Sequence, residues 1–236
     1  MQNKISVIIP AYNEEKNIPQ IIRALRKQIY KNFEIIVVDN NSQDNTFKVA
    51  KKFSDRVYKC TEQGISPARN YGASKSRCEI VAFLDADSTP SNNWVEQIKL
   101  AFDNNPQLSA ITGLDVYEHR NAFKKNFINI YSHLCFNLCR ISNVLKKPTI
   151  IGNNFAIKRK LFEKLGGFPK LIVEDYYFSK KLQKFPGVQC ISNPKMKVEL
   201  SSRRLEKEGV FKTQYLWLKS LFAELPQKSY KFHDEI

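Results

Sequence analysis

The sequence predicts an α/β fold whose central, mostly parallel sheet is covered by helices on both faces. In residues 5–102, short β-branched apolar runs alternate with segments whose apolar residues recur at helical spacing, in the order βαβαβαβα. Three runs also stop at polar residues, in SVIIPAYNEE (6–15), VVDNNSQDNT (37–46) and VAFLDADSTP (81–90). Because parallel strands deliver their carboxyl ends to one edge, where ligands bind, we expect one site there.

The first half contains the elements that define this fold. Its expected strands are Ile5–Ile9, Phe33–Val38, Val57–Cys60 and Glu79–Leu84. The first helix has apolar residues at helical spacing, at Ile18, Ile21, Ile22, Leu25 and Ile29. The next three helices are expected to begin at the N-capping residues Ser42, Ser66 and Ser91. Pro67 suits the first position of its helix.

The pattern changes after Asn105-Pro106. Further strands are expected at Leu108–Gly113, Thr149–Ile157, Val188–Ile191 and Lys195–Leu200. Residues 122–145 indicate one long helix or a broken helix pair, and shorter helices are expected at 158–165, 174–184 and 205–225.

Composition limits the compartment and the partners. No apolar run approaches the roughly 18 residues of a membrane span, and the apolar stretch at the start is too short for a signal peptide. Five scattered cysteines indicate reduced thiols. We therefore expect a cytoplasmic protein, or one bound peripherally to the cytoplasmic face of a membrane.

The net charge of +15 is unusually positive. It implies acidic partners such as phosphate-bearing ligands, anionic lipid or nucleic acid, although solvated lysines would give the same value. No nucleic-acid-binding motif is present, so nucleic acid is not an expected partner.

Carboxylates at the strand ends are the first candidates for chemistry. Asp85 and Asp87 form a DxD, and carboxylates together with substrate phosphates suit Mg²⁺ or Mn²⁺; the alternative is an ordinary capped turn. Asp39 could accept a hydrogen bond from a base beside Pro10, Ala11 and Tyr12, or it could close an Asx-turn.

Four charged residues in three other motifs have similar alternatives. Arg69 could pair with a diphosphate or be a solvated charge. One carboxylate of Glu174-Asp175 could be a general base, or both could be favourable first-turn helix residues. Glu14 could likewise be a first-turn residue.

The motifs together resemble the family 2 glycosyltransferases. PAYNEE, VVDNNSQDNT, ARNYGA, FLDADS, GNNFAIKRKLFEKLGGF and VED occur in that family's order and approximate spacing, over roughly residues 4–200. The resemblance implies a GT-A (Rossmann-like) fold with a smaller acceptor-side sheet. It implies one domain over 1–236, with a nucleotide-sugar-binding half (1–110), an acceptor-binding and catalytic half (111–200) and a basic C-terminal helical segment (201–236).

The resemblance also implies residue roles. The nucleotide and donor sugar would contact Pro10, Ala11, Tyr12, Glu14, Asp39, Arg69, Asp85 and Asn153. The metal, Mn²⁺ or Mg²⁺, would be held by Asp87, with Asp85 beside it. Asp175 would be the base, with Glu174 as the alternative.

The implied activity is inverting transfer of a sugar from a nucleotide-diphospho-sugar to an acceptor hydroxyl in cell-surface glycan synthesis. A UDP-sugar is the favoured donor and GDP-mannose the rival. Where processive synthases carry QxxRW, this chain has LSSRRLEKEGVF, whose Arg203 and Arg204 could close over the diphosphate or form a solvated turn. A sugar nucleotidyltransferase and a non-catalytic nucleotide-sugar-binding relative remain as alternatives.

Two amphipathic segments leave open a membrane contact and a lipid-linked acceptor. In 122–145, one side carries Phe123, Phe127, Ile130, Leu134, Leu138 and Ile141. Its flanks carry Lys124, Lys125, Arg140, Lys146 and Lys147, and a second stripe lies in 205–225. Such faces suit an anionic membrane surface, and they equally suit packing on the protein's own core or on a partner subunit.

Overall fold

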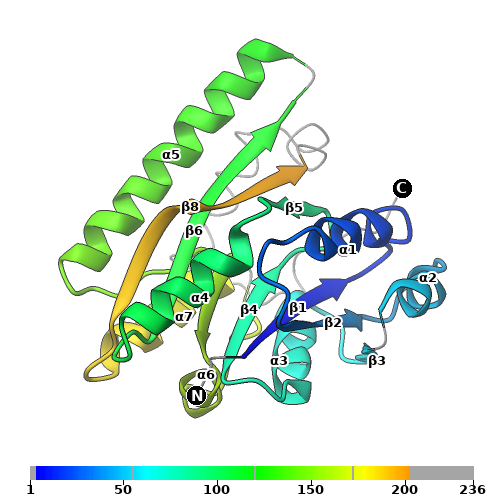
Figure 1. The fold of residues 1–236 in the computed structure, drawn as a ribbon, viewed down its shortest axis with the longest axis horizontal. Coiled ribbons are helices and arrows are strands. Elements are labelled where there is room, and N and C mark those ends of the chain that lie inside the picture. Colours follow the sequence, from blue (N-terminus) through cyan, green and yellow to red (C-terminus); the bar gives the residue numbers. More distant parts are fainter. Residues whose placement is uncertain (1–3, 55, 120, 172, 202–236) are drawn as a thin grey trace.

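One eight-stranded sheet, in the spatial order β3-β2-β1-β4-β7-β6-β8-β5, forms the centre of the fold (Figure 1). The computed structural model describes residues 4–54, 56–119, 121–171 and 173–201. The strands are β1 (Ile5–Ala11), β2 (Phe33–Asp39), β3 (Val57–Lys59), β4 (Ile80–Leu84), β5 (Ser88–Pro90), β6 (Ala110–Glu118), β7 (Asn154–Lys158) and β8 (Cys190–Ser201). The helices are α1 (Ile18–Arg26), α2 (Thr46–Phe53), α3 (Ile65–Lys75), α4 (Trp94–Asn104), α5 (Ala122–Val144), α6 (Arg159–Lys164) and α7 (Glu174–Lys184).

The first four strands of this order form the predicted parallel half. β1 pairs in parallel with β2 and β4, and β2 pairs in parallel with β3. The register sets Ala11 opposite Asp39 and Ile8 opposite Phe83. The polar ends of β1, β2 and β4 therefore lie at one edge of the sheet, as the sequence predicts.

The other half is mixed. β7 runs antiparallel to both β4 and β6, β8 is parallel to β6, and β5 is antiparallel to β8. The smaller sheet that we expect on the acceptor side is thus a continuation of the same sheet. The expected division of the chain at residue 110 falls at the start of β6, and the assignment of roles to the halves stays a prediction.

β8 is one strand where the sequence suggests two. Opposite β6, the pairing jumps from Gly113↔Asn193 to Leu114↔Lys197, so residues 194–196 form a bulge. Pro194 cannot donate to a ladder, and a bulge is where a strand tolerates it. The polar break in the sequence is therefore a bulge inside a strand.

Helices cover both faces of the sheet. Buried side chains of α1, α2 and α4 form one core with β1, and those of α3, α6 and α7 form the other. The second core contains a cluster of Phe83, Phe155, Phe162, Phe168 and Phe178, whose neighbouring rings lie 4.9–6.2 Å apart. All five cysteines are free thiols.

Helix starts are where the sequence expectations fail most. Ser42, Ser66 and Ser91 do not cap: α2 begins after Asn45, α3 after Gly64 and α4 after Asn93. The Ser42 hydroxyl instead accepts a hydrogen bond from Asn13 N at 3.0 Å. α1 ends at Arg26, which leaves Ile29 60% exposed. The expected helix at 205–225 lies outside the described residues.

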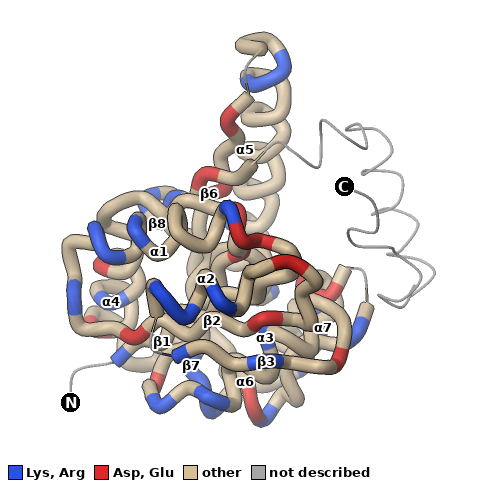
Figure 2. Tube along the Cα trace, turned by 90° about the vertical axis from the view of Figure 1, so that its right-hand side faces the viewer, with Lys and Arg blue, Asp and Glu red and all other residues tan. Residues whose placement is uncertain are grey.

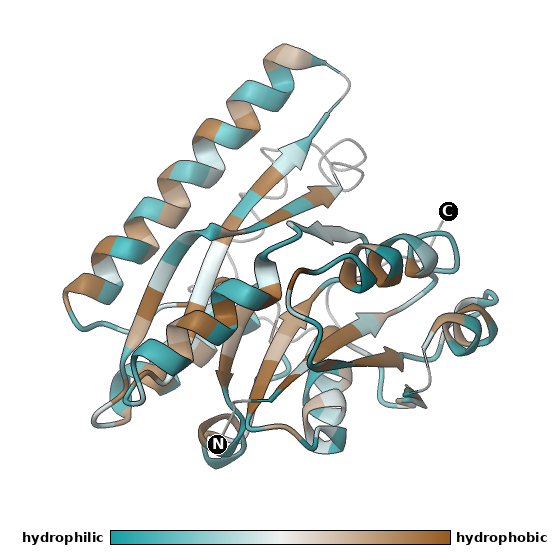
Figure 3. Ribbon diagram, viewed as in Figure 1, coloured by the Kyte–Doolittle hydropathy of each residue, from teal (hydrophilic) through white to brown (hydrophobic). Residues whose placement is uncertain are grey.

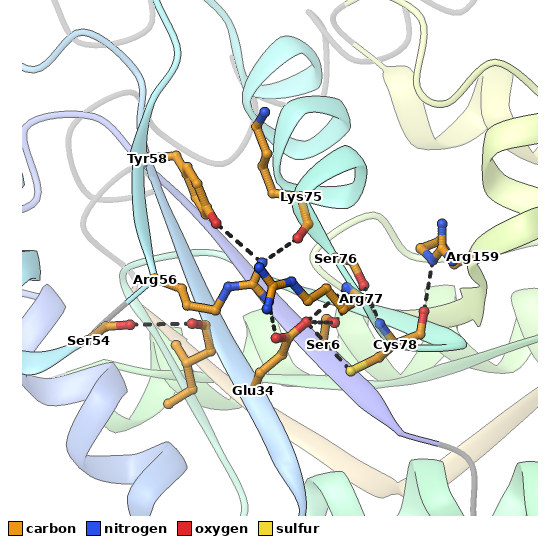
Figure 4. A network of polar contacts seen from close by, with 11 residues as sticks. Ser6, Glu34, Ser54, Arg56, Tyr58, Lys75, Ser76, Arg77, Cys78 and Arg159 are labelled. Atoms are coloured by element: carbon orange, nitrogen blue, oxygen red, sulfur yellow. Dashed lines mark hydrogen bonds and ion pairs between the residues drawn. The ribbon is translucent and has the colours of Figure 1, made fainter. Parts of the chain in front are cut away.

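A polar network joins the opposite, amino-terminal edge of the parallel strands (Figure 4). The Glu34 carboxylate on β2 accepts hydrogen bonds from Ser6, Arg56 and the backbone N of Arg77. Burial raises the pKa of Glu34, but these hydrogen bonds outweigh it and the net pKa is lowered. This network ties β1, β2 and the end of α3 together, far along the strands from the polar edge.

Gly72 lets α3 approach the sheet closely. A Cβ at this position would lie 2.4 Å from Ile8 Cγ2 and 3.0 Å from Val38 Cγ2, both on buried strands. We expect Gly72→Ala to reduce the free energy of unfolding by about 1–3 kcal/mol through overpacking. Urea denaturation measures this. For comparison, a Cβ at Gly166 would have no atom within 4 Å, but the residue has a positive φ. Gly166→Ala therefore measures the effect of backbone strain without overpacking.

Candidate active site

A buried arginine joins the two acidic motifs. Arg69 on α3 is 1% exposed, and its Nη2 lies 2.7 Å from Asp85 Oδ1, directly after β4. Its Nη1 lies 2.5 Å from Glu174 Oε1, at the start of α7. Residues separated by 16 and 105 positions in the sequence are thus brought to one cation.

The neighbouring residues explain why Arg69 is held in place. The Asn70 side chain donates to Phe168 O and accepts from Phe168 N, both at 2.9 Å. This fixes the Phe168 ring, whose centroid lies 5.3 Å from Arg69 Cζ. The guanidinium therefore has an aromatic face on one side and two carboxylates at its end.

This geometry adds ion pairs that the sequence does not predict for Arg69. Both of its terminal nitrogens are paired to carboxylates and the residue is 1% exposed, and the expected contact with a diphosphate stays a prediction. Its Nε is buried and finds no acceptor in the described part of the chain. Arg69 thus joins Asp85 to Glu174.

Glu174 and Asp175 differ in access. Glu174 is 8% exposed and bound to Arg69, whereas Asp175 is only partly buried. Asp175 Oδ2 accepts a hydrogen bond from Gly152 N at 3.3 Å. Burial raises the pKa of Glu174 to about 7 against the lowering effect of Arg69, and burial also raises the pKa of Asp175. Asp175 is therefore the more accessible carboxylate of the pair.

Strand β6 brings a further carboxylate that the sequence does not predict. Asp115, in the middle of β6, is 6% exposed, and Asn154 Nδ2 donates to its Oδ1 at 3.0 Å. The pKa of Asp115 is raised to about 7, mainly by burial. The charges of Asp85 and Asp175 also raise this pKa, and the hydrogen bond from Asn154 opposes the shift. The three carboxylates therefore share one electrostatic environment.

The sequence gives only a weak signal for Asp115. The strand reads AITGLDVYE and continues beyond the expected end at Gly113, so Asp115 lies inside the strand. A lone Asp within an otherwise apolar, buried strand was the available clue, because a buried charge needs a partner.

Asn153 lies in the same loop as Gly152. Its Nδ2 is buried and makes no hydrogen bond of ordinary geometry with any described residue, although it lies close enough to Asp115 to lower that pKa. A buried amide without an acceptor is unfavourable by itself, and it fits a position that a bound group completes.

The ends of β1 and β2 form the other part of the edge. Asp39 is 2% exposed, and its Oδ1 has no hydrogen-bond partner in the described residues. Asp39 lies across β1 from the end of β4, about 10 Å away at the usual strand spacing. Pro10 and Ala11 are the buried residues of β1 between them.

Much of the polar sequence after these strands is structural. Asn13 and Asn41 adopt positive φ where each strand ends, and Asn13 Oδ1 accepts from Gln43 N at 2.8 Å. Glu14 is 8% exposed and its carboxylate accepts from Asn17 Nδ2 at the start of α1. Tyr12 beside them is partly exposed.

The DxD is the available metal-binding pair. Asp87 is partly exposed in the turn between β4 and β5, and the described residues contain no group of three or more His, Cys, Asp or Glu side chains placed to hold a metal. Mg²⁺ is commonly held by only one or two carboxylates plus substrate phosphates, so Asp85 and Asp87 fit such a site. Arg203 and Arg204 lie outside the described residues.

The comparison with protein families agrees with this geometry. Residues 6–166 match the model described as glycosyl transferase family 2. The chain belongs to this family. It is therefore a glycosyltransferase with a GT-A fold, which confirms the predicted family, fold and enzyme class. The family assignment favours sugar transfer over the nucleotidyl transfer that the sequence left open.

Curated glycosyltransferases are similar to this chain in sequence. The chain is 35% identical over 188 residues to "Probable glycosyltransferase YdaM" of Bacillus subtilis, which covers 73% of this chain and 44% of that protein. It is 30% identical over 193 residues to "UDP-Glc:alpha-D-GlcNAc-diphosphoundecaprenol beta-1,3-glucosyltransferase WfgD" of Escherichia coli, covering 80% and 73%. The chain thus spans less than half of the Bacillus relative.

Solved structures share the fold. A mannosyltransferase of Pyrobaculum calidifontis, in complex with GDP-Man and Mn²⁺, has a TM-score of 0.65 at 23% identity, covering 84% of this chain and 57% of that one. Residues 1–349 of TarS from Staphylococcus aureus, in complex with UDP-GlcNAc, have a TM-score of 0.64 at 19% identity, covering 84% and 58%.

Gly152 is needed for the close approach of the loop to α7. A Cβ there would lie 2.9 Å from Asp175 Cβ and 3.5 Å from Arg69 Nη1. We expect Gly152→Ala to displace Asp175 and lower kcat by roughly 10²-fold, since small displacements of reacting groups have effects of this size. Steady-state kinetics with unchanged donor affinity would support this; an unchanged kcat would contradict it. Gly187→Ala, with open space around it but strained φ, is the control.

Proposed function

We propose that this chain is a metal-dependent, inverting glycosyltransferase that moves a sugar from a nucleotide-diphospho-sugar to an acceptor hydroxyl. The observation that carries the proposal is the bridge Asp85–Arg69–Glu174, which joins the DxD turn to the start of α7. A pair of acidic motifs held together by a buried cation supports a single site with a donor-side and an acceptor-side carboxylate.

The acceptor side is Asp175. Its carboxylate takes the proton of the acceptor hydroxyl as that oxygen bonds to the anomeric carbon. The bond from the anomeric carbon to the phosphate oxygen breaks, and the nucleoside diphosphate leaves with the electron pair. One displacement from the opposite side inverts the anomeric centre. Partial exposure of Asp175, next to the buried Glu174, supports Asp175 as the group that meets the acceptor.

The donor side is the edge formed by β1, β2 and β4. The buried, unpaired Oδ1 of Asp39 is suited to accept a hydrogen bond from an N–H of the base, beside Pro10, Ala11 and Tyr12. Glu14 supports the start of α1 at the same end. Asn153, which precedes β7 and has an unpaired side-chain amide, would contact the sugar. The relatives named with UDP-Glc and UDP-GlcNAc support a UDP-sugar, and the mannosyltransferase keeps GDP-mannose as the rival.

Asp87 and Asp85 would hold Mn²⁺ or Mg²⁺, which neutralises charge on the leaving diphosphate when bound. The Mn²⁺ in the Pyrobaculum structure supports this. We expect Asp87→Ala to remove any rise in melting temperature that a nucleotide-sugar gives only with Mn²⁺. Glu163→Ala, at an exposed position on α6, should keep the rise. A full rise in Asp87→Ala would contradict this metal assignment.

A lipid-linked acceptor in cell-surface glycan synthesis, met at the cytoplasmic face of a membrane, is supported by the name of the WfgD relative, which specifies a diphosphoundecaprenol acceptor.

The test of the function is a panel of nucleotide-sugars measured by thermal shift with and without Mn²⁺. The donor that raises the melting temperature is then offered with lipid-diphosphate-linked sugars, and release of the nucleoside diphosphate is followed. Transfer to an acceptor is the expected result. Metal-dependent donor binding without transfer to any acceptor, or hydrolysis alone, would favour the non-catalytic alternative.

A further inference from the structure

Helix α5 presents an apolar stripe to the solvent on the side opposite the sheet. Its inner side is buried on β6 and β8 through Ile128, Ser132, Phe136 and Cys139. The outer side carries six apolar residues at helical spacing, which are 53–81% exposed: Phe123, Phe127, Ile130, Leu134, Leu138 and Ile141. Figure 3 shows the hydrophobic bands repeated along the helix.

This exposure bears on the alternatives that the sequence leaves open. No described residue covers the stripe, so the stripe does not pack on the described core. Val144 and Leu145 extend it at 75% and 65% exposed. A continuous apolar surface of this length on a described, well-packed helix indicates an interaction site.

The charges around the stripe identify the kind of partner. α5 contains no acidic residue, and the exposed Lys124 and Arg140 lie on it. Lys146 and Lys147 follow directly and are also exposed. Within the described part of the chain, Lys125 pairs with Glu118 at the end of β6. An apolar stripe with basic edges matches an anionic lipid surface, which receives the stripe below the headgroups and the lysines among them.

A second copy of the chain is a poorer match. Two stripes facing each other would bring two sets of basic residues together, on a chain that already carries a net charge of +15. The position of α5 also favours a surface: it lies at the edge of the molecule and extends beyond the body of the fold (Figures 1 and 2).

We propose that α5 docks the protein on an anionic lipid surface, with its axis in the plane of the surface and its stripe at the headgroup–acyl boundary. None of the described helices is long and apolar enough to cross a membrane, so this contact is interfacial. The proposal rests on α5 alone and does not depend on the sugar-transfer activity.

The test is co-sedimentation of the full chain with vesicles of phosphatidylglycerol and phosphatidylcholine, and with vesicles of phosphatidylcholine alone. Ile130→Glu/Leu134→Glu places two charges in the centre of the stripe. Ile29→Glu/Leu100→Glu is the matched control, because these residues lie after α1 and on α4, are 60% and 44% exposed, and give the same change in charge. Melting temperature and mass in solution are measured for each variant.

The expected result is binding to anionic vesicles that weakens with salt and is at least about ten-fold weaker in the α5 variant, with the control unchanged. Equal binding by both variants, or no binding of the unmodified chain, would overturn the proposal. A dimer that the α5 variant dissociates would assign the stripe to a second copy. A large fall in melting temperature in the α5 variant alone would show that the chain itself covers the stripe, and would also overturn it.

Discussion

Asp175→Asn is expected to lower the transfer rate by about 10²–10⁴-fold while leaving metal-dependent donor binding intact. The amide keeps the shape and can still accept from Gly152 N, but it cannot take a proton from the acceptor. The measurement is kcat beside the donor-induced thermal shift. Glu174→Gln tests the alternative base, and it should lower the melting temperature because it weakens the bond to Arg69. Normal turnover in Asp175→Asn would remove Asp175 as the base.

The pH dependence gives the same assignment a second test. Burial raises the pKa of Asp175 above the ordinary value of 3.8. The base must be deprotonated to act. The value of kcat/KM should therefore rise with pH, and the midpoint of this rise should lie above pH 3.8. In Asp175→Asn this acid limb should disappear from the residual activity. An unchanged acid limb would mean that another group governs it.

Replacing Arg69 is expected to have the largest effect on stability. Arg69→Met leaves the buried Glu174 carboxylate without its cation, and removing one partner of a buried pair costs about 3–5 kcal/mol. The Asp85 side chain is 30% exposed, so that pair adds less. Chemical denaturation measures the loss. Arg56→Met removes an arginine from the network at the opposite edge, whose pair is 21% exposed on both sides, and should cost clearly less.

The Arg69 prediction has a defined pH dependence. Burial holds the pKa of Glu174 at about 7 in the folded protein, above its ordinary value of 4.5. The contribution of protonated Glu174 to the free energy of unfolding is therefore fully present below pH 4.5. It is lost as the pH rises through about 7. Because Arg69 lowers the pKa of Glu174, removing Arg69 makes the charged carboxylate even less favourable in the folded protein. Arg69→Met should therefore be more destabilised at pH 8 than at pH 5. Glu174→Gln in the Arg69→Met background should recover part of the loss at pH 8. No recovery would show that Arg69 stabilises the fold by packing alone.

The sequence predicts the parallel half of the fold well because its signals are local. β1 and β4 are short apolar runs that are buried throughout, and the polar strand ends follow from chain direction. The single extended β8 was not predictable in the same way, since the bulge at Pro194 depends on pairing with β6. The predicted Ser42 cap is wrong because the Ser42 hydroxyl accepts from the backbone N of Asn13 in another loop. The Ser91 hydroxyl instead donates to Asn93 Oδ1, and Ser66 lies inside α3.

The candidate site likewise contains residues that the sequence predicts and residues that only the packed structure reveals. Asp39 ends β2 and Asp85 follows β4 at one edge of the sheet, as their motifs predict, and Asp85 is joined through Arg69 to Glu174, beside Asp175. The role of Arg69 could not be read from ARN, because its two carboxylate partners come from other elements. Asp115 was missed because its significance depends on burial next to Asn154, which only the packed β6 and β7 create. For α5, the stripe was evident in the sequence, and only the structure shows that the described fold leaves it uncovered.

The most direct test of the account is the anomeric configuration of the first product, measured by proton NMR during transfer from a UDP-α-glucose-type donor. A single displacement driven by one carboxylate predicts a β-linked product, seen by its large H1–H2 coupling from the earliest time point. An α-linked product at that time point would contradict the assignment of Asp175 as the base that faces the acceptor across the Asp85–Arg69–Glu174 bridge.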